Sequence, residues 1–256
     1  MGAKGKIGLI GLAVMGANLA RNLAGHGIST VVYNRSRDKT ENFLKEFGSD
    51  TNLSGAAALE ELVNSLEKPR KIILMIKAGE AVDAMIAKLI PLLEKDDILI
   101  DGGNSFFEDT RRRSREMEAL GVHFVGMGVS GGEEGALHGP SLMPGGTREA
   151  YDALAPILKA VSAKAEGEAC VDYMGPDGAG HYVKMVHNGI EYADMQMIAD
   201  TYFVMKNVLG MTAEEMADTW ETWNKGELSS YLVEITARIL RKADEMTGKP
   251  LVDVIL

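Results

Sequence analysis

The sequence has one cysteine, Cys170, among its 256 residues, so no disulfide can form within the chain. A chain without disulfides is typical of the reducing cytosol. No apolar run reaches the ~18 residues that a membrane-spanning helix needs. No charged-then-apolar leader stands before the first expected strand, at residues 6–10. These absences predict a cytoplasmic protein with no membrane segment.

Positive charge is also scarce in this chain. It has 27 lysines and arginines against 37 aspartates and glutamates, which gives a net charge of −10. That balance argues against nucleic acid as a partner. The five histidines are scattered along the chain, so we expect no metal site. Apolar residues make up 46% of the sequence, enough for a sizeable core in one large domain or two smaller ones.

A glycine-containing turn follows the first expected strand, and it opens a helix over residues 18–26 and a second strand at 30–34. Strand, turn, helix and strand in about thirty residues form the unit that binds dinucleotides. Gly11 permits the tight turn, Gly16 permits close packing of helix on strand, and Ala13 replaces the usual middle glycine. The backbone N–H groups here would hold a diphosphate, unless the turn is purely structural. The candidate cofactor-binding residues are Gly11, Leu12, Ala13, Val14, Met15 and Gly16.

The end of the second strand bears on which dinucleotide binds. A carboxylate there would bind the ribose hydroxyls of NAD, but this chain has Asn34, Arg35 and Ser36 instead. A guanidinium can grip a 2′-phosphate bidentately. We therefore predict NADP as the cofactor; the alternative is that Arg35 and Arg37 are ordinary loop charges.

Further strands are expected at residues 71–76, 97–101 and 122–126, with helices between them. This alternation predicts an α/β fold, a Rossmann-type doubly wound sheet. Ligands bind where the strands of such a sheet end. The further cofactor candidates are therefore Ile76, Lys77, Ala78 and Asn104.

Two other local patterns carry structural expectations. Ser54 is expected to cap a helix that runs to about residue 66. The arginine-rich run at 111–115, on an expected helix, is interpreted as a solvated face.

The last strand leads into a glycine-rich stretch at residues 127–135. Closely spaced glycines bring backbone amides together and create a place for an oxyanion or a sugar hydroxyl. Ser130, followed by Gly131 and Gly132, adds a hydroxyl group. The alternative is a flexible loop.

Strand–helix alternation ends at residues 175–180, and only helices are expected beyond it. We therefore predict two domains, 1–177 and 178–256. The second begins with a long helix over about 178–208, which is apolar on several faces and so is expected to be buried. Thr212 is expected to cap the next helix, and residue 228 or 229 to open a third.

One face of the long helix is polar. Its residues recur at i, i+3, i+4 and i+7, so they fall within an arc of roughly 100°. They are Lys184, His187, Asn188 and Glu191. Ionisable groups on a buried helix commonly form functional sites. The alternative from the helix alone is a solvent-facing polar stripe.

Five stretches of this sequence closely resemble decarboxylating 6-phosphogluconate dehydrogenase. They are residues 11–16, 34–36, 101–104, 128–135 and 184–192. The resemblance implies an NADP-dependent oxidative decarboxylation of 6-phosphogluconate to ribulose 5-phosphate, in the pentose phosphate pathway and gluconate utilisation. It implies Lys184 as the base that takes the 3-hydroxyl proton and Glu191 as the acid that protonates the enediol after CO₂ departs. It implies substrate contacts from Asn104, Ser130, Gly131, Gly132, His187, Asn188 and Tyr192.

These roles place demands on the two catalytic groups. A lysine acts as a base only when it is neutral, so its pKa must be lowered. A buried helix would supply that shift to Lys184 and the opposite shift to Glu191. His181, one turn before Lys184, is interpreted as structural.

Chains of this family continue well past this length, roughly doubling it. A following segment with a Lys-Gly-Thr-Gly motif, later basic residues that grip the substrate phosphate, and a tail that reaches into the partner subunit of a homodimer have no counterpart here. The sequence therefore looks like the front half of the enzyme, with a truncated all-helical substrate and dimerisation domain. Without that half, Met195, Met197 and Tyr202 are expected to be exposed.

Two alternatives to the full reaction stay open. A fragment that lacks phosphate ligands would bind NADP without turnover. A shorter β-hydroxyacid dehydrogenase, acting on an unphosphorylated acid, shares the glycine turn and a helical Lys–Asn pair. The run from His187 to Tyr192 argues against the second alternative.

Overall fold

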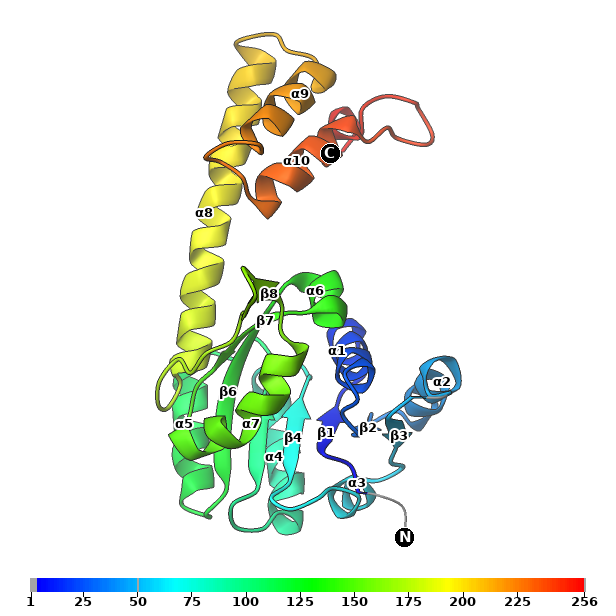
Figure 1. Ribbon diagram of the computed structural model, residues 1–256, viewed down its shortest axis with the longest axis vertical. Helices are drawn as coiled ribbons and strands as arrows, with labels where there is room; N and C mark the ends of the chain where they lie inside the picture. Colours follow the sequence, from blue (N-terminus) through cyan, green and yellow to red (C-terminus); the bar gives the residue numbers. More distant parts are fainter. Residues whose placement is uncertain (1–3, 50, 256) are drawn as a thin grey trace. The chain divides into compact units, whose positions relative to one another are not determined.

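The computed structural model describes residues 4–49 and 51–255. Its first part contains a sheet with the strand order β3-β2-β1-β4-β5-β6-β7 (Figure 1). All neighbouring strands are parallel except β6 and β7. The strands are β1 (Ile7–Ile10), β2 (Thr30–Tyr33), β3 (Leu53–Gly55), β4 (Lys71–Leu74), β5 (Ile98–Asp101), β6 (His123–Ser130) and β7 (Ser141–Pro144). The predicted Rossmann-type fold is confirmed.

Helices cover both faces of this sheet, because its strands carry apolar side chains on both faces. On one face, α1 (Val14–Gly25), α2 (Arg37–Phe47) and α7 (Arg148–Val161) pack against Leu9 and Val125. On the other, α3 (Leu59–Asn64), α4 (Glu80–Leu89) and α5 (Phe107–Glu118) pack against Ile72 and Phe124. Each fully buried aliphatic side chain contributes about 1.5–3 kcal/mol, so the two cores hold the strand ends in place.

Ser54 does not cap a helix, contrary to the prediction. It lies in β3, at the edge of the sheet, where it is paired with Val31 of β2. The helix that follows begins only at Leu59. Residues 53–55 form an edge strand instead of the start of a helix because β2 provides backbone hydrogen bonds to them. A 3₁₀ turn (Ile90–Leu92) and a small hairpin of β8 (Lys164–Ala165) and β9 (Glu168–Ala169) complete this part.

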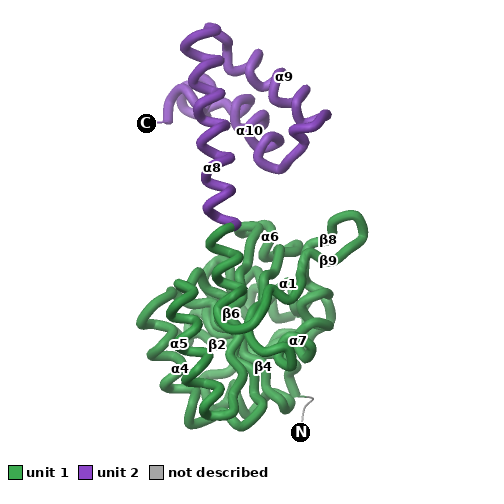
Figure 2. The backbone as a smooth tube through the Cα atoms, turned by 90° about the vertical axis from the view of Figure 1, so that its left-hand side faces the viewer, with its two compact units in different colours: residues 1–186 green, residues 187–256 purple. Residues whose placement is uncertain are grey.

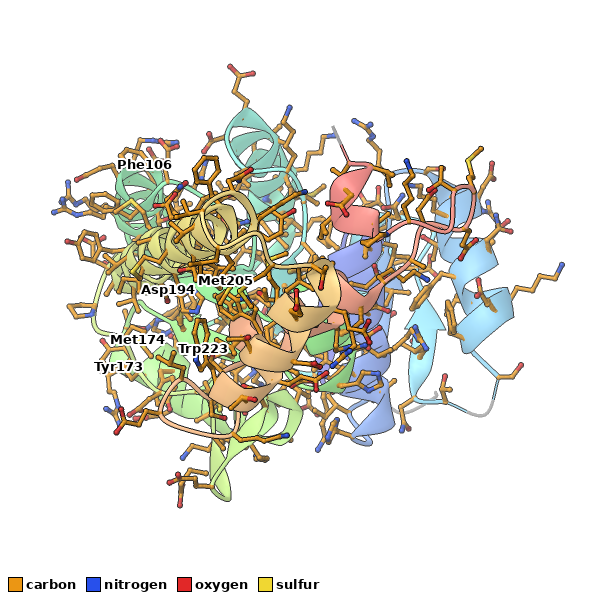
Figure 3. The ribbon with its side chains drawn as sticks, turned by 90° about the horizontal axis from the view of Figure 1, so that it is seen from above. Phe106, Tyr173, Met174, Asp194, Met205 and Trp223 are labelled. Atoms are coloured by element: carbon orange, nitrogen blue, oxygen red, sulfur yellow. The ribbon has the colours of Figure 1, made fainter. Side chains whose placement is uncertain are left out.

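The last part of the chain is helical, as predicted. It contains α8 (Ala179–Asn207), α9 (Ala213–Trp223), α10 (Tyr231–Arg241) and a 3₁₀ turn (Leu251–Asp253). Thr212 caps α9 in a reciprocal capping box with Glu215, as its position predicted. Met205 of α8 and Trp223 of α9 belong to one small apolar core (Figure 3). The third helix is capped by Ser230, one or two residues later than expected.

The chain divides into two compact units, residues 1–186 and 187–256 (Figure 2). This division falls within α8, whereas the predicted domain boundary, 177/178, precedes that helix. No helix in the described part of the chain combines the length and the apolar character that crossing a membrane requires.

Candidate functional site

The glycine turn after β1 is built by close backbone contacts. Gly11 has a φ of +106°, and a Cβ on it would lie 2.3 Å from the carbonyl oxygen of Met75. A Cβ on Gly16 would lie 2.0 Å from the carbonyl oxygen of Gly11. Both positions therefore need glycine, for the tight turn and for the approach of α1 to the strand.

The start of α1 is suited to an anion. Ala13 is its N-cap, with an extended backbone, and no described side chain caps the helix. Ala13 and Val14 are exposed at this end. Uncapped N–H groups and the helix dipole together favour a phosphate group here. The turn thus fits the diphosphate of a dinucleotide.

Asn34 links the end of β2 to the glycine turn. Its Oδ1 accepts a hydrogen bond from the N–H of Leu12 at 3.1 Å, and its Nδ2 donates to the carbonyl oxygen of Ser36 at 3.2 Å. The sequence pointed to Asn34 as a ligand residue and did not reveal this structural role. Arg35 and Ser36 are exposed just beyond it. Arg37 instead pairs with Glu41 at 2.7 Å on the surface of α2.

The ends of β4 and β5 carry the next candidates. Ile76 and Ala78 are half-buried, while Lys77 and Asn104 are exposed. Asn104 stands on a turn held by the buried Asp101, which accepts hydrogen bonds from Ser105 Oγ at 2.6 Å and from the N–H of Gly103 at 3.1 Å. The turn is thus fixed by a carboxylate that the sequence analysis did not single out.

Arg113 is not part of a solvated face, contrary to the prediction. It is fully buried, and its Nε and Nη2 donate to the carboxylate of Asp83 at 2.8 and 3.0 Å. The hydrogen bond from Arg113 is the main cause that lowers the pKa of Asp83 to about 2. Arg113 also lies 3.6 Å from Asp101. Its place between the buried Thr110 and Met117, at helical spacing, is the signal that could have revealed it.

The predicted glycine-rich loop is mostly regular structure. β6 continues through Ser130 because β7 pairs with its last four residues, and α6 (Gly132–His138) follows at once. Only the turn between them remains, with φ values of +132° at Gly131 and +60° at Gly132. α6 packs on α1 through Asn22, whose Nδ2 donates to the carbonyl oxygen of Ala136 at 3.1 Å. The structure therefore brings the helices that follow the two glycine turns together.

The first turns of α8 belong to the first unit. Lys184 is 8% exposed and His181 is 2% exposed. His181 Nδ1 lies 2.6 Å from Thr110 Oγ1 of α5. Burial is the main cause that lowers the pKa of His181. Its hydrogen bond and burial agree with the structural role expected of it.

The other polar residues of the predicted face lie in the second unit. His187 Nδ1 is 3.2 Å from Asn188 Oδ1 and 3.8 Å from Glu191 Oε2. The side chain of Glu191 is 42% exposed, and Tyr192 is exposed as well. The burial expected for Glu191 is therefore wrong in this chain.

The expectation that α8 is buried between other elements is also wrong for part of the helix in the described chain. Ile190 and Met197 are each 60% exposed, and Met185 is exposed too. Met195 and Met197 are exposed as predicted, but Tyr202 packs against the core of the second unit.

A cavity of about 500 Å³ in the first unit lies elsewhere. It is lined by residues of β7, by Cys170 and its neighbours, and by Val183. None of the predicted site residues lines it.

Comparison with known families identifies the chain. The family model of the NAD binding domain of 6-phosphogluconate dehydrogenase matches residues 6–175, and that of its C-terminal domain matches residues 180–256. The chain belongs to the 6-phosphogluconate dehydrogenase family. The resemblance found in the sequence is thereby confirmed.

Relatives of known name agree. The chain is 62% identical to the NADP(+)-dependent, decarboxylating 6-phosphogluconate dehydrogenase of Bacillus subtilis, covering 99% of this chain and 54% of that protein. The decarboxylating enzyme of Escherichia coli strain K12 is 57% identical, with the same coverage. The chain spans about half the length of the curated relatives it matches.

Solved structures give the same picture. The structure of Plasmodium falciparum 6-phosphogluconate dehydrogenase, described in apo form and with NADP+ or 6-phosphogluconate, is 48% identical, with a TM-score of 0.95, and covers 98% of this chain and 54% of that one. A Mycobacterium tuberculosis 3-hydroxyisobutyrate dehydrogenase matches with a TM-score of 0.70 at 21% identity, covering 89% of this chain and 72% of that one. The second likeness shows a shared fold only.

Proposed function

We propose that this chain carries the coenzyme site and the catalytic helix for NADP-dependent oxidative decarboxylation of 6-phosphogluconate to ribulose 5-phosphate and CO₂. The observation that carries the proposal is the burial of Lys184 at the start of α8, in a chain 62% identical to an enzyme named for this reaction. Burial penalises a charged amine, and a base must be neutral. The roles proposed below for the other residues come from the resemblance to the 6-phosphogluconate dehydrogenase family.

NADP is the proposed cofactor. The residues that would hold it are the glycine turn 11–16, the strand ends 34–36 and 76–78, and Asn104. The exposed N-terminus of α1 suits its diphosphate, and Arg35 with Ser36 suits its 2′-phosphate. When bound, NADP supplies the acceptor for the hydride that leaves C3 of the substrate.

The chain's own residues manage the protons. Lys184 takes the proton of the 3-hydroxyl as the C3 hydride departs, which leaves a 3-keto acid. Such a β-keto acid loses CO₂ readily to give an enediol. Lys184 returns its proton to the 3-oxygen as the enediol forms, and it takes that proton back as Glu191 protonates the enediol carbon, which gives ribulose 5-phosphate.

Polar groups in both units are proposed to bind the substrate. They are Asn104, Ser130, Gly131, Gly132, His187, Asn188 and Tyr192. The contact of His187 with Asn188 and Glu191 supports their action as a group. We also propose domains at 1–177 and 178–256, a homodimer for the full-length family, and a cytoplasmic location.

The test is steady-state formation of NADPH from 6-phosphogluconate, with Lys184→Met as the comparison. Loss of one acid–base group costs about 10²–10⁴-fold in rate, and we expect a loss in that range. Turnover that survives the change would exclude Lys184 as the base. Small unphosphorylated hydroxy acids serve as control substrates, and preferential oxidation of these would favour a β-hydroxyacid dehydrogenase.

One observation favours a second function, NADP binding without turnover. Glu191 is substantially exposed in this chain, so the described residues do not enclose the proposed acid. Titration with NADPH, followed by its fluorescence, separates the two functions. Micromolar binding with no turnover of 6-phosphogluconate would support the binding function.

A further inference from the structure

The β6 glycine pair, Gly126 and Gly128, lies under the first turns of α8. Along β6, Val125 and Met127 point into the core shared with α1 and α7. Side chains alternate along a strand, so positions 126 and 128 face the opposite side. Both glycines are buried. Something must therefore cover them on that side.

The covering groups are side chains of α8, joined at Gly126 by Thr110 of α5. A Cβ on Gly128 would lie 2.6 Å from the Cβ of Lys184 and 3.1 Å from its Cγ. A Cβ on Gly126 would lie 2.5 Å from Thr110 Cγ2 of α5 and 2.9 Å from His181 Nδ1 of α8. Real Cβ atoms are essentially never found closer than 3.0 Å to such atoms. Each glycine thus makes room for one side chain of the helix.

The two glycines and the α8 side chains that face them follow the same order along their elements, although the two spacings differ. Positions two apart on a strand are separated by about 6.6 Å, and positions three apart on a helix rise by about 4.5 Å on nearly the same face. His181 and Lys184 are three apart, and Gly126 and Gly128 are two apart. About one turn of the helix, from His181 to Lys184, therefore lies over one two-residue repeat of the strand, from Gly126 to Gly128.

The helix also comes close through its own backbone. A Cβ on Gly180 would lie 2.1 Å from the carbonyl oxygen of Gly126 and 2.3 Å from that of Met143. His181 is held at the same end by its 2.6 Å contact with Thr110. The depth of the first turns is thus fixed at Gly180 and His181, and Gly128 sets how closely Lys184 can follow.

We propose that Gly128 is a positioning residue for Lys184. It sets the depth of the Lys184 side chain against β6, while Gly126 and His181 anchor the preceding turn. The inference rests on the proposed role of Lys184 as the base, because depth matters only if the amine must meet a substrate. A displacement of about 1 Å at a reacting group can cost ~10²-fold in rate, so such a device has a functional consequence.

The test measures the chemical reactivity of the Lys184 amine and does not require turnover. The full chain is labelled with trace acetic anhydride at a series of pH values, and acetylation at Lys184 is measured by mass spectrometry against the exposed Lys39. Gly128→Ala is expected to change the relative rate at Lys184 by about threefold or more. The control is Gly25→Ala, whose Cβ meets nothing within 4 Å, and it should change nothing. A Gly128→Ala profile equal to wild type would overturn the proposal.

A second arm covers the case in which Gly128→Ala does not fold. Lys184→Gly removes the Cβ that the new alanine meets. The fall in Tm caused by Gly128→Ala should therefore be smaller in the Lys184→Gly background, and a double variant should fold even if the single one does not. Equal falls in both backgrounds, or an unfolded double variant, would contradict the proposal.

Turnover distinguishes this inference from the proposed function. If the wild-type chain turns over, Gly128→Ala should lower kcat more than it raises KM. An inactive wild-type chain would count against the proposed function, while the labelling would still test the seating of Lys184. A Gly128→Ala variant with wild-type kcat would count against positioning.

Discussion

The two ends of α8 bury different kinds of side chain: His181 and Lys184 at the start, and Met205 near the end. In its first turns the polar side chains of His181 and Lys184 are buried, whereas further along Ile190, Met197 and Phe203 are exposed. An ordinary amphipathic helix would place these residue types the other way round. The cause is the packing of each part within the described chain: the first turns pack against β6, whereas Ile190, Met197 and Phe203 are left exposed.

The first turns meet a surface shaped for them. Glycines on β6 let the helix approach closely, and Thr110 shares a hydrogen bond with His181. A buried polar group is tolerated when it has such a partner. The comparison teaches that polar residues of a helix can be buried where small residues elsewhere in the fold make room for them. The following predictions test this contrast.

The largest effect is expected at Gly180. Gly180→Ala would place a methyl group within 2.3 Å of two carbonyl oxygens, so we expect it to destabilise the chain by about 3 kcal/mol or more. Gly189→Ala, on the same helix, meets nothing within 4 Å and should stabilise by about 0.5–1 kcal/mol. Urea denaturation measures both. Similar changes in the free energy of unfolding at Gly180 and Gly189 would contradict the proposed difference between the first turns and the rest of α8.

The next effect is expected at Asp83 of α4, which pairs with the buried Arg113 of α5. Asp83→Asn leaves the buried Arg113 without its main partner, and Asp83 is partly exposed, so we expect a loss of about 2 kcal/mol. The pKa of Asp83 is lowered to about 2, so its contribution is present above about pH 4 and is lost as the pH falls toward 2. Denaturation at pH 7 and pH 3 measures this, and a variant as stable as wild type at pH 7 would contradict it.

A smaller effect is expected from the hydroxyl that holds His181. Thr110→Val removes a buried hydrogen bond and should cost about 1–2 kcal/mol. The matched change in the exposed part of α8 is Thr201→Val, whose hydroxyl bonds to the carbonyl oxygen of Met197, and it should cost less than about 0.5 kcal/mol. Equal losses in the free energy of unfolding for the two variants would mean that burial of the Thr110–His181 hydrogen bond does not add to stability.

The pH dependence of stability offers a related test. The pKa of His181 is lowered chiefly by burial, with Asp101 opposing that shift and Arg113 adding to it. The unfolded chain then binds a proton first, so stability falls as the pH drops below about 6.5, by at most ~1.4 kcal/mol per pH unit for this group. His181→Gln should flatten the slope between pH 7 and pH 5, and His138→Gln on the surface should not. An unchanged slope in His181→Gln would contradict the assignment.

The smallest effect is expected in the apolar part of the helix. Met197→Gln should change the free energy of unfolding by less than about 0.5 kcal/mol, because the side chain is already exposed. A loss above about 1 kcal/mol would show that Met197 is covered in solution. Thermal unfolding at several protein concentrations measures the effect and reveals any association.

The sequence predicted the elements whose signals are local. The long helix predicted over about 178–208 and the cap at Thr212 follow from local patterns, and both agree with the structure. The glycine turn was predicted for the same reason. Family resemblance supplied the site residues, which geometry alone would have left as a polar stripe.

Features that depend on distant partners could not be predicted in the same way. Ser54 joins an edge strand because β2 lies beside it, and Arg113 is buried because Asp83 and Asp101 meet it there. Gly128 looked like part of a loop because its reason for being glycine is Lys184, which is 56 positions further along the chain. No local pattern contains that information.

The most direct test of the central claim is kcat for the oxidation of 6-phosphogluconate with NADP by the chain and by Lys184→Met, with NADPH binding measured in parallel. The account predicts a loss in kcat of about 10²–10⁴-fold with NADPH binding unchanged. A Lys184→Met variant that keeps the wild-type kcat would contradict it.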